Sequence, residues 1–141
     1  MGERERAIAH ARTQVSPGLP LIVRLFFEGT LAVLEGRRDD VLTTADRLLK
    51  LWSLRDPCGT YYFARSLAAV QHPEALSMFR RAVEGGYHCA PFFWRDPWLD
   101  SLRGDPGFDA VIQIAEAGCR DAAAAFVAAG GEQMLGPVRQ E

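Results

Sequence analysis

The chain has 141 residues, of which 48% are hydrophobic and 24% are charged, and its formal net charge is −2. This length corresponds to one domain, and the composition is that of an ordinary globular protein, which excludes collagen, disordered chains and disulfide-stapled miniproteins. Sixteen basic residues against eighteen acidic ones produce no global positive field, so neither nucleic acid nor an anionic membrane is an expected partner.

The sequence carries no recognisable targeting signal. Residues 1–6 bear charges of both signs, and no apolar segment typical of a secretory signal follows them. The longest apolar stretch, 17–34, includes Arg24 and Glu28, whereas a membrane span needs about 20 nearly uncharged residues. We therefore expect a cytoplasmic protein, and an odd number of widely spaced cysteines agrees with a reducing compartment. These cysteines are Cys58, Cys89 and Cys119.

Glycine and proline divide the N-terminal part of the chain into helical segments. A first helix is expected over residues 3–14 and is interrupted by Ser16-Pro17-Gly18. A second is expected over 19–35, because Gly36 is suited to the left-handed position that ends a helix. A third is expected over 39–52, where apolar residues recur at intervals of three and four.

The dipeptide Asp-Pro marks the helix starts in the rest of the chain. It occurs at Asp56, Asp96 and Asp105. An Asp side chain accepts hydrogen bonds from the free amides of a first helical turn, and Pro at the first helical position has no amide to leave unpaired. The predicted helices span residues 57–70, 98–102 and 107–129.

One more helix is predicted between these, over residues 73–83. Pro73 opens it and Gly85-Gly86 closes it. No segment of useful length alternates with a period of two, so no sheet is expected. The fold class is therefore all-α, with about six or seven antiparallel helices in one domain over residues 1–141.

An internal period supports a repeat architecture. Ala75, Phe79 and Ala82 lie on one helix face in the order small, aromatic, small, and a shift of 34 residues aligns this helix with residues 41–49. This is the second-helix pattern of a tetratricopeptide (TPR) repeat. Residues 19–87 thus resemble two degenerate TPR-like units, with Gly29 at the small crossing position of the first.

The segments 82–87 and 94–108 add a more particular resemblance. They are similar to the C-terminal TPR modules of bacterial Ser/Thr kinases, adenylate cyclases and winged-helix transcription regulators. In those modules the Asp-Pro, Leu-Arg and Asp-Pro-x-Phe elements form a short helix and the start of a closing helix. The resemblance implies a TPR-like α-α superhelix in which residues 88–129 supply those two elements, and it implies no catalysis.

Residues suited to catalysis or metal binding are few. His88 and Cys89 are adjacent, so their side chains diverge, and no second close ligand pair accompanies them, which argues against zinc. If His88 were a general base and Cys89 a nucleophile, the pair would also need an Asn or Asp to orient the histidine, and none can be placed from the sequence. A small enzyme built on this pair is the least favoured function, and we expect no catalytic residue, no metal and no cofactor.

Aromatic residues give the strongest functional signal, because Tyr and Trp together with Arg dominate interface energetics. Tyr61 and Tyr62 are adjacent on one helix and cannot both face the core. One of them should line the concave surface of the array, near Arg65, which lies one turn further along.

A second group of aromatics lies in residues 92–98. Phe93 and Trp94 are assigned to an exposed anchor for a partner. The aromatic residues expected to be buried against the long last helix are Phe92, Trp98 and Phe108.

The last predicted helix is unusually long. At about 1.5 Å per residue, some 22 residues span roughly 33 Å, so part of it should project beyond its neighbours unless Gly118 bends it. Its outer end is rich in alanine. This predicts either a homodimer through residues 108–129 or coverage of that face by the N-terminal helix.

The sequence therefore predicts a non-enzymatic module that binds a peptide or protein partner. Binding would use the concave face or the aromatic segment, because stacked helical pairs offer an extended surface but few convergent catalytic groups. The alternative is a small-ligand sensing domain with an apolar pocket under residues 92–98.

Overall fold

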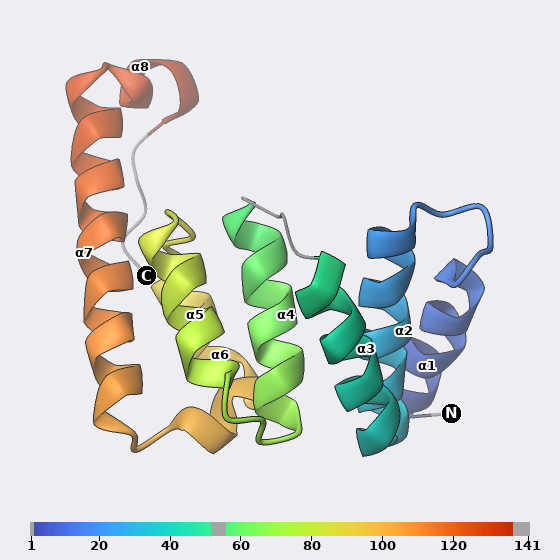
Figure 1. Ribbon diagram of the computed structural model, residues 1–141. Coiled ribbons are helices and arrows are strands. Elements are labelled where there is room, and N and C mark those ends of the chain that lie inside the picture. Colours follow the sequence, from blue (N-terminus) through green and yellow to red (C-terminus); the bar gives the residue numbers. More distant parts are fainter. Residues whose placement is uncertain (1, 52–55, 137–141) are drawn as a thin grey trace.

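The computed structural model describes residues 2–51 and 56–136, and within these ranges the chain is helical without any strand (Figure 1). The longer helices pack antiparallel to their neighbours. None of the described helices is long and apolar enough to cross a membrane. The elements are α1 (Glu3–Gln14), α2 (Leu21–Glu35), α3 (Arg38–Leu51), α4 (Pro57–Ala69), α5 (Ala75–Glu84), α6 (Ala90–Arg95), η1 (Pro97–Leu102, a 3-10 helix), α7 (Pro106–Ala128) and α8 (Gly131–Leu135).

All three Asp-Pro starts are confirmed. The carboxylate of Asp56 accepts hydrogen bonds from the first amides of α4, the shorter at 2.8 Å. Asp105 accepts one at 2.7 Å from the start of α7, and Asp96 accepts one at 3.0 Å from the start of η1. In each case Pro follows the capping residue, so the first turn has one amide fewer to satisfy.

The other predicted boundaries hold to within two residues where they are described. Gly36 ends α2 with φ +73°, the left-handed conformation that glycine adopts without cost. The second helix starts at Leu21, after Pro20 at the N-cap position with ψ 139°, and α5 starts at Ala75, after a turn at residues 73–74. The predicted end of the third helix, Trp52, lies outside the described residues.

The expected number of helices was too low, since two short helices had not been predicted. α6 has six residues, too few for a periodic pattern, and its run of aromatics resembles an irregular segment. Gly130 follows the end of α7 with φ +74°. Gly131 does not extend the break between helices but is the first residue of α8.

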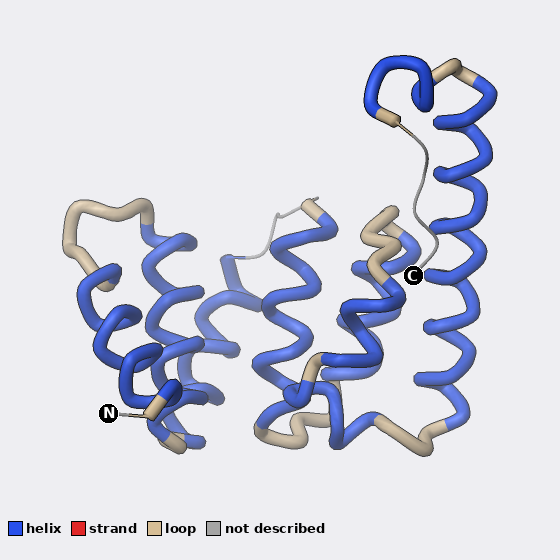
Figure 2. Tube along the Cα trace, turned by 180° about the vertical axis from the view of Figure 1, so that it is seen from behind, coloured by secondary structure: helices blue, strands red, loops and turns tan. Residues whose placement is uncertain are grey.

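The helices are arranged in a row from α1 to α7. α1 packs on α2, α2 on α3, α4 on α5, and α5 on α7, while η1 lies against α4. α1 and α7 occupy opposite ends of the molecule in both views (Figures 1 and 2), so the N-terminal helix does not cover the long last helix. That alternative is wrong, because α1 is held on α2 by ionic contacts such as the one from Arg12 to Glu35.

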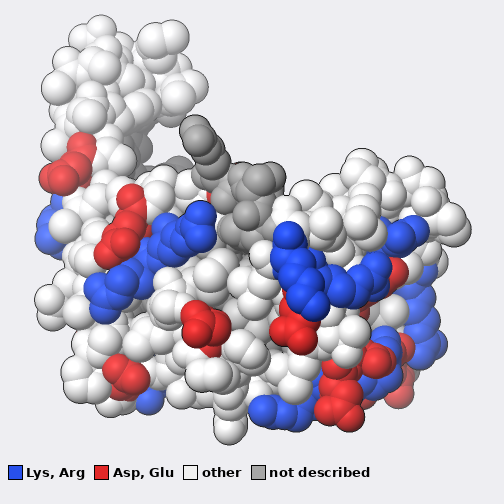
Figure 3. Space-filling view, in the orientation of Figure 1, with Lys and Arg blue, Asp and Glu red and all other residues white. Residues whose placement is uncertain are grey.

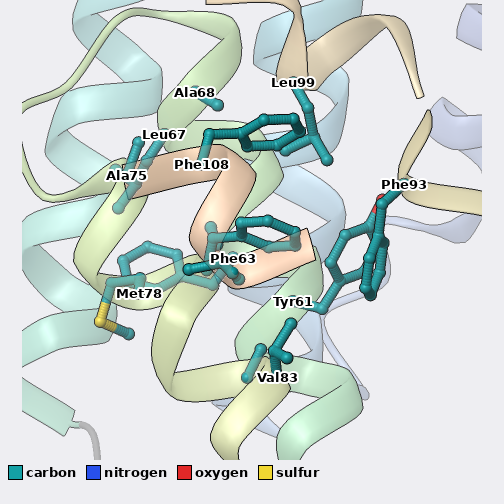
Figure 4. Packing of buried hydrophobic residues seen from close by; sticks show 14 of the residues in the cluster. Tyr61, Phe63, Leu67, Ala68, Ala75, Met78, Val83, Phe93, Leu99 and Phe108 are labelled. Carbon is teal, nitrogen blue, oxygen red and sulfur yellow. The ribbon is translucent and has the colours of Figure 1, made fainter. Parts of the chain in front are cut away.

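The main core extends from α2 and α3 through α4, α5, α6 and η1 to α7, and its C-terminal part is rich in aromatic rings (Figure 4). Ala75, Phe79 and Ala82 are completely buried there, as expected for one face of α5. The ring of Phe79 stacks on Phe108 of α7 at a centroid distance of 5.6 Å and meets Phe93 of α6 edge-on at 5.0 Å. These rings fix the positions of α6 and α7 relative to α5.

α7 extends past the end of α5, as the sequence predicted (Figure 1). The helix runs without a break through Gly118, so this glycine does not interrupt it. A Cβ at this position would lie only 2.1 Å from Nδ1 of His88. Gly118 therefore makes room for the histidine ring against α7.

Candidate interaction surface

Tyr61 and Tyr62 differ sharply in burial, which confirms that only one of them faces the core. Tyr61 has no exposed surface, and its ring lies 5.1 Å from the ring of Phe93 (Figure 4). The ring of Tyr87 is at the same distance from it. Tyr62 keeps 43% of its surface exposed. Of the two tyrosines predicted as binding residues, only Tyr62 can touch a partner.

The hydroxyl of Tyr61 donates a hydrogen bond to Asp96, which is itself buried. Asp96 also accepts a hydrogen bond from Nη2 of Arg65 at 3.0 Å, and its second oxygen lies 2.8 Å from Nε of Arg65. Burial, reinforced by the neighbouring Asp96 carboxylate, raises the pKa of the Tyr61 phenol above its ordinary value. The phenol therefore stays protonated and serves as a donor.

The sequence predicted Asp96 only as a helix cap. Its partners on α4 are 31 and 35 residues away in the chain, and local sequence patterns do not indicate contacts between residues so far apart. The carboxylate satisfies a cap, a phenol and a guanidinium at once, which compensates the cost of burying its charge.

Arg65 lies beside Tyr62, as predicted. Its guanidinium carbon is 5.7 Å from the centroid of the Tyr62 ring and 4.3 Å from the centroid of the Trp98 ring, both within cation–π range. Because Asp96 already neutralises it, Arg65 presents a fixed and largely paired cation between two aromatic rings.

Two of the aromatic assignments in the 92–98 segment were wrong. Phe92, expected to be buried, is 45% exposed, and Phe93, assigned to the exposed anchor, is completely buried. The reason is the unpredicted helix α6, which turns the middle residue of the run toward Phe79 and its two neighbours outward. Trp98 is half-buried under Arg65, and Phe108 is fully buried as expected.

We call the following group the Tyr62 surface: the exposed rings of Tyr62 and Phe92 together with the partly buried Arg65 and Trp98. Tyr62 and Phe92 both lie edge-on to the buried Tyr61 ring, with centroid distances of 5.6 Å and 5.8 Å. The surface therefore rests on the rigid core beneath it, and its side chains come from α4, α6 and η1.

Trp94 belongs to a different surface. It is 47% exposed, as predicted, and its indole N–H donates to a carboxylate oxygen of Glu116 on α7 at 3.4 Å. It borders an open groove between α6 and α7 with a volume of about 440 Å³, which we call the α6–α7 groove. The groove is lined by Ala90, Pro91, Trp94, Arg95, Glu116, Cys119 and Arg120.

The space directly under residues 92–98 is filled by side chains. Phe93 and Leu99 are completely buried there, in contact with the main core. The α6–α7 groove opens beside this segment instead of beneath it, and it is exposed to solvent.

His88 and Cys89 have separate surroundings. The His88 ring lies against Gly118, and its backbone carbonyl accepts a hydrogen bond from the Cys119 thiol. All three cysteines are free thiols. Within residues 2–51 and 56–136, no group of three or more His, Cys, Asp or Glu side chains is placed to hold a metal ion.

Comparison of the sequence with protein-family models and with curated proteins, and of the chain with solved structures, gave no match.

Proposed function

We propose that this protein is a non-enzymatic module that binds a peptide or protein partner through the Tyr62 surface. The observation that carries the proposal is the exposure of Tyr62 and Phe92, whose rings both lie edge-on to the buried Tyr61 ring, while the Tyr61 hydroxyl is hydrogen-bonded to the buried Asp96. Aromatic side chains with an arginine are the residues that contribute most to binding interfaces. Arg65 is already fixed in place, so binding costs less side-chain entropy than it would with a free arginine.

The proposed architecture is a TPR-like α-α superhelix. Residues 19–87 would form two degenerate units, α2 with α3 and α4 with α5, and residues 88–129 would supply a short helix and a closing helix. The pairwise packing of α2 on α3 and of α4 on α5 supports this assignment. The complete burial of Ala75, Phe79 and Ala82 supports it as well, since small residues on this face let neighbouring helices approach closely.

We further propose self-association through the exposed end of α7. Val127 is 48% exposed there, and Met134 on the adjoining α8 is 84% exposed. The face of this end seen in Figure 3 carries no charge on its tip. Exposed apolar groups gathered at one place favour association over a monomeric state. The cytoplasmic location proposed from the sequence agrees with three free thiols.

A peptide-display selection tests the binding proposal. The full chain is immobilised, random peptides are selected on it, and the affinities of the enriched peptides are measured by titration calorimetry. Tyr62→Ala and Phe92→Ala should each weaken binding by about tenfold, because each removes an exposed ring at the centre of the surface. Leu21→Ala, which trims an equally exposed apolar side chain on α2, is the matched control.

Two results would contradict the proposal. One is a failure to enrich any peptide over a control surface. The other is enrichment of peptides whose affinity responds to neither Tyr62→Ala nor Phe92→Ala while all variants keep the circular dichroism spectrum of the parent protein.

A further inference from the structure

The α6–α7 groove has a chemistry different from that of the Tyr62 surface. One wall is Trp94 of α6, whose ring meets Phe108 edge-on at 6.0 Å and is thereby supported from the core. Arg103 covers part of the ring at 5.9 Å and donates to the backbone carbonyl of Trp94 at 2.8 Å. The opposite wall is the middle of α7, with Glu116 engaged by the indole N–H. Trp94 is therefore held in place while nearly half of it stays exposed.

The charges around this groove are unequal. Arg95 and Arg120 line it and are exposed, and among the described residues neither has an ion-pair or hydrogen-bond partner. The lining carboxylate, Glu116, accepts a hydrogen bond from Trp94 and keeps its negative charge, so the two arginines leave the lining with a formal net charge of +1 (two positive, one negative). Asp121 follows Arg120 on α7 but does not line the groove.

Arg103, which covers part of the Trp94 ring, is by contrast bound to Asp100 at 2.7 Å. The two unpaired guanidinium groups beside an exposed indole are thus a local excess of positive charge on a protein whose net charge is −2.

We propose that the α6–α7 groove binds a short acidic segment of a partner protein, with an apolar side chain of that segment packed on Trp94 and its carboxylates paired with Arg95 and Arg120. Guanidinium groups bind carboxylates through paired, charge-assisted hydrogen bonds. The groove volume of about 440 Å³ is in the range that accommodates a few side chains. A nucleic acid fits less well, since it needs more phosphate-binding cations than two.

This proposal concerns a second surface and does not depend on the Tyr62 surface. Its test uses fluorescein-labelled peptides and the full chain, with affinity measured by fluorescence anisotropy. The acidic peptide is Glu-Asp-Glu-Phe-Glu-Asp-Glu. Two peptides serve for comparison: an isosteric neutral one, Gln-Asn-Gln-Phe-Gln-Asn-Gln, and an acidic one with Gly in place of Phe. A single-stranded oligodeoxythymidylate is the nucleic-acid probe.

The acidic Phe peptide should bind with a Kd below about 1 mM and more tightly than the other two peptides. Arg95→Gln and Arg120→Gln should each weaken it on the order of fivefold, and salt should weaken it further. Trp94→Ala should remove the preference for Phe over Gly. Arg81→Gln on α5 makes the same change of charge at an exposed arginine outside the groove and should leave the affinity unchanged.

Several outcomes would overturn the proposal. They are no binding of the acidic Phe peptide, equal binding of the neutral peptide, or equal weakening by Arg81→Gln, which would indicate a bulk charge effect. Tighter binding of the oligonucleotide with the same dependence on Arg95 and Arg120 would assign the groove to nucleic acid instead. Variants with Tyr62→Ala should behave like the parent, so a failure here is distinct from a failure of the Tyr62 surface.

Discussion

The first half of α7 and its second half continue the same apolar stripe, but the first half packs on α5 and α6, whereas the second half adjoins the short helix α8. Phe108, Val111 and Ala115 are completely buried, whereas Val127 is 48% exposed three turns further along. The first half faces α5 and α6, whose aromatic rings fill the space between the helices. The second half has passed the end of α5 (Figure 1).

The difference shows that a periodic apolar pattern predicts the apolar face of a helix but does not predict whether that face is buried. Apolar residues at helical spacing predict a helix and the side of it that is apolar. Whether that side is buried depends on the lengths of the neighbouring helices, which are set elsewhere in the sequence. α7 is long because Asp105 starts it and no glycine or proline stops it before Gly130.

Removing a ring from the packed half should have the largest effect. Phe108→Ala should lower the free energy of unfolding by about 3–5 kcal/mol, because it leaves a cavity between Phe79 and Trp94. Val127→Ala in the projecting half should change it by less than about 0.5 kcal/mol. Urea denaturation followed by circular dichroism measures both. Equal losses would mean that the second half of α7 is packed in solution.

The polar contact beneath the Tyr62 surface should give the next largest effect. Tyr61→Phe removes the hydroxyl that donates to Asp96 and leaves one partner fewer for a buried carboxylate, which should cost about 1–3 kcal/mol. Tyr62→Phe on the exposed side of the same helix is the matched control and should be near neutral. Urea unfolding of the two variants side by side decides the matter, and a neutral Tyr61→Phe would disprove the contact.

α1 offers a third kind of attachment, by charge instead of apolar packing. It buries only Ala11, and Glu35 of α2 is bound by Arg12 of α1 at 2.6 Å and by Arg37 at 2.7 Å. The hydrogen bond from Arg12, and then that from Arg37, hold the pKa of the Glu35 carboxyl below its ordinary value. A lowered folded-state pKa contributes stability above the unfolded pKa that is lost as pH falls through the folded one.

Stability should therefore fall in acid partly through this carboxylate. Urea unfolding at neutral pH and at successively lower pH values, for the parent and for Glu35→Gln, measures the effect. The two proteins should differ at neutral pH and converge in acid. A constant difference at every pH would show that the ionised carboxylate does not contribute.

The smallest energetic effect is expected from association of the projecting end. Light scattering over a range of protein concentrations should show a mass that rises from 15.6 kDa for the monomer toward twice that value. Met134→Ser combined with Leu135→Ser should shift the protein back to the monomer, since both exposed side chains are apolar. Leu49→Ser on α3 is the matched control. A constant monomer mass for the parent would exclude the dimer.

Local signals were enough to predict most of the helices but not the detail of the candidate site. The three Asp-Pro starts and the Gly36 stop act through the backbone next to them, so the sequence reports them directly. Adjacent aromatic residues in a segment too short to show an apolar period do not indicate which of them is buried. Phe92 was expected to be buried and Phe93 to be exposed, and the structure shows the reverse. A rotation of α6 about its axis by one residue position is enough to change which of the two rings faces the core.

The network around Asp96 could not be predicted for a different reason. Its contacts with Tyr61 and Arg65 depend on where η1 is brought relative to α4, which results from the packing of the whole C-terminal part. The sequence did place Arg65 near Tyr62, because both lie on one helix.

Asp96 also limits how the protein can be divided into fragments. The repeat pattern proposed from the sequence suggests a cut between residues 87 and 88, which would separate the two proposed TPR-like units from the proposed closing segment. Such a cut would leave the Tyr61 hydroxyl and the Arg65 guanidinium on one piece and their carboxylate on the other. The unit boundary in the sequence is therefore not a boundary of independent folding, and shortened versions of the protein need to keep α4 and η1 on one continuous chain.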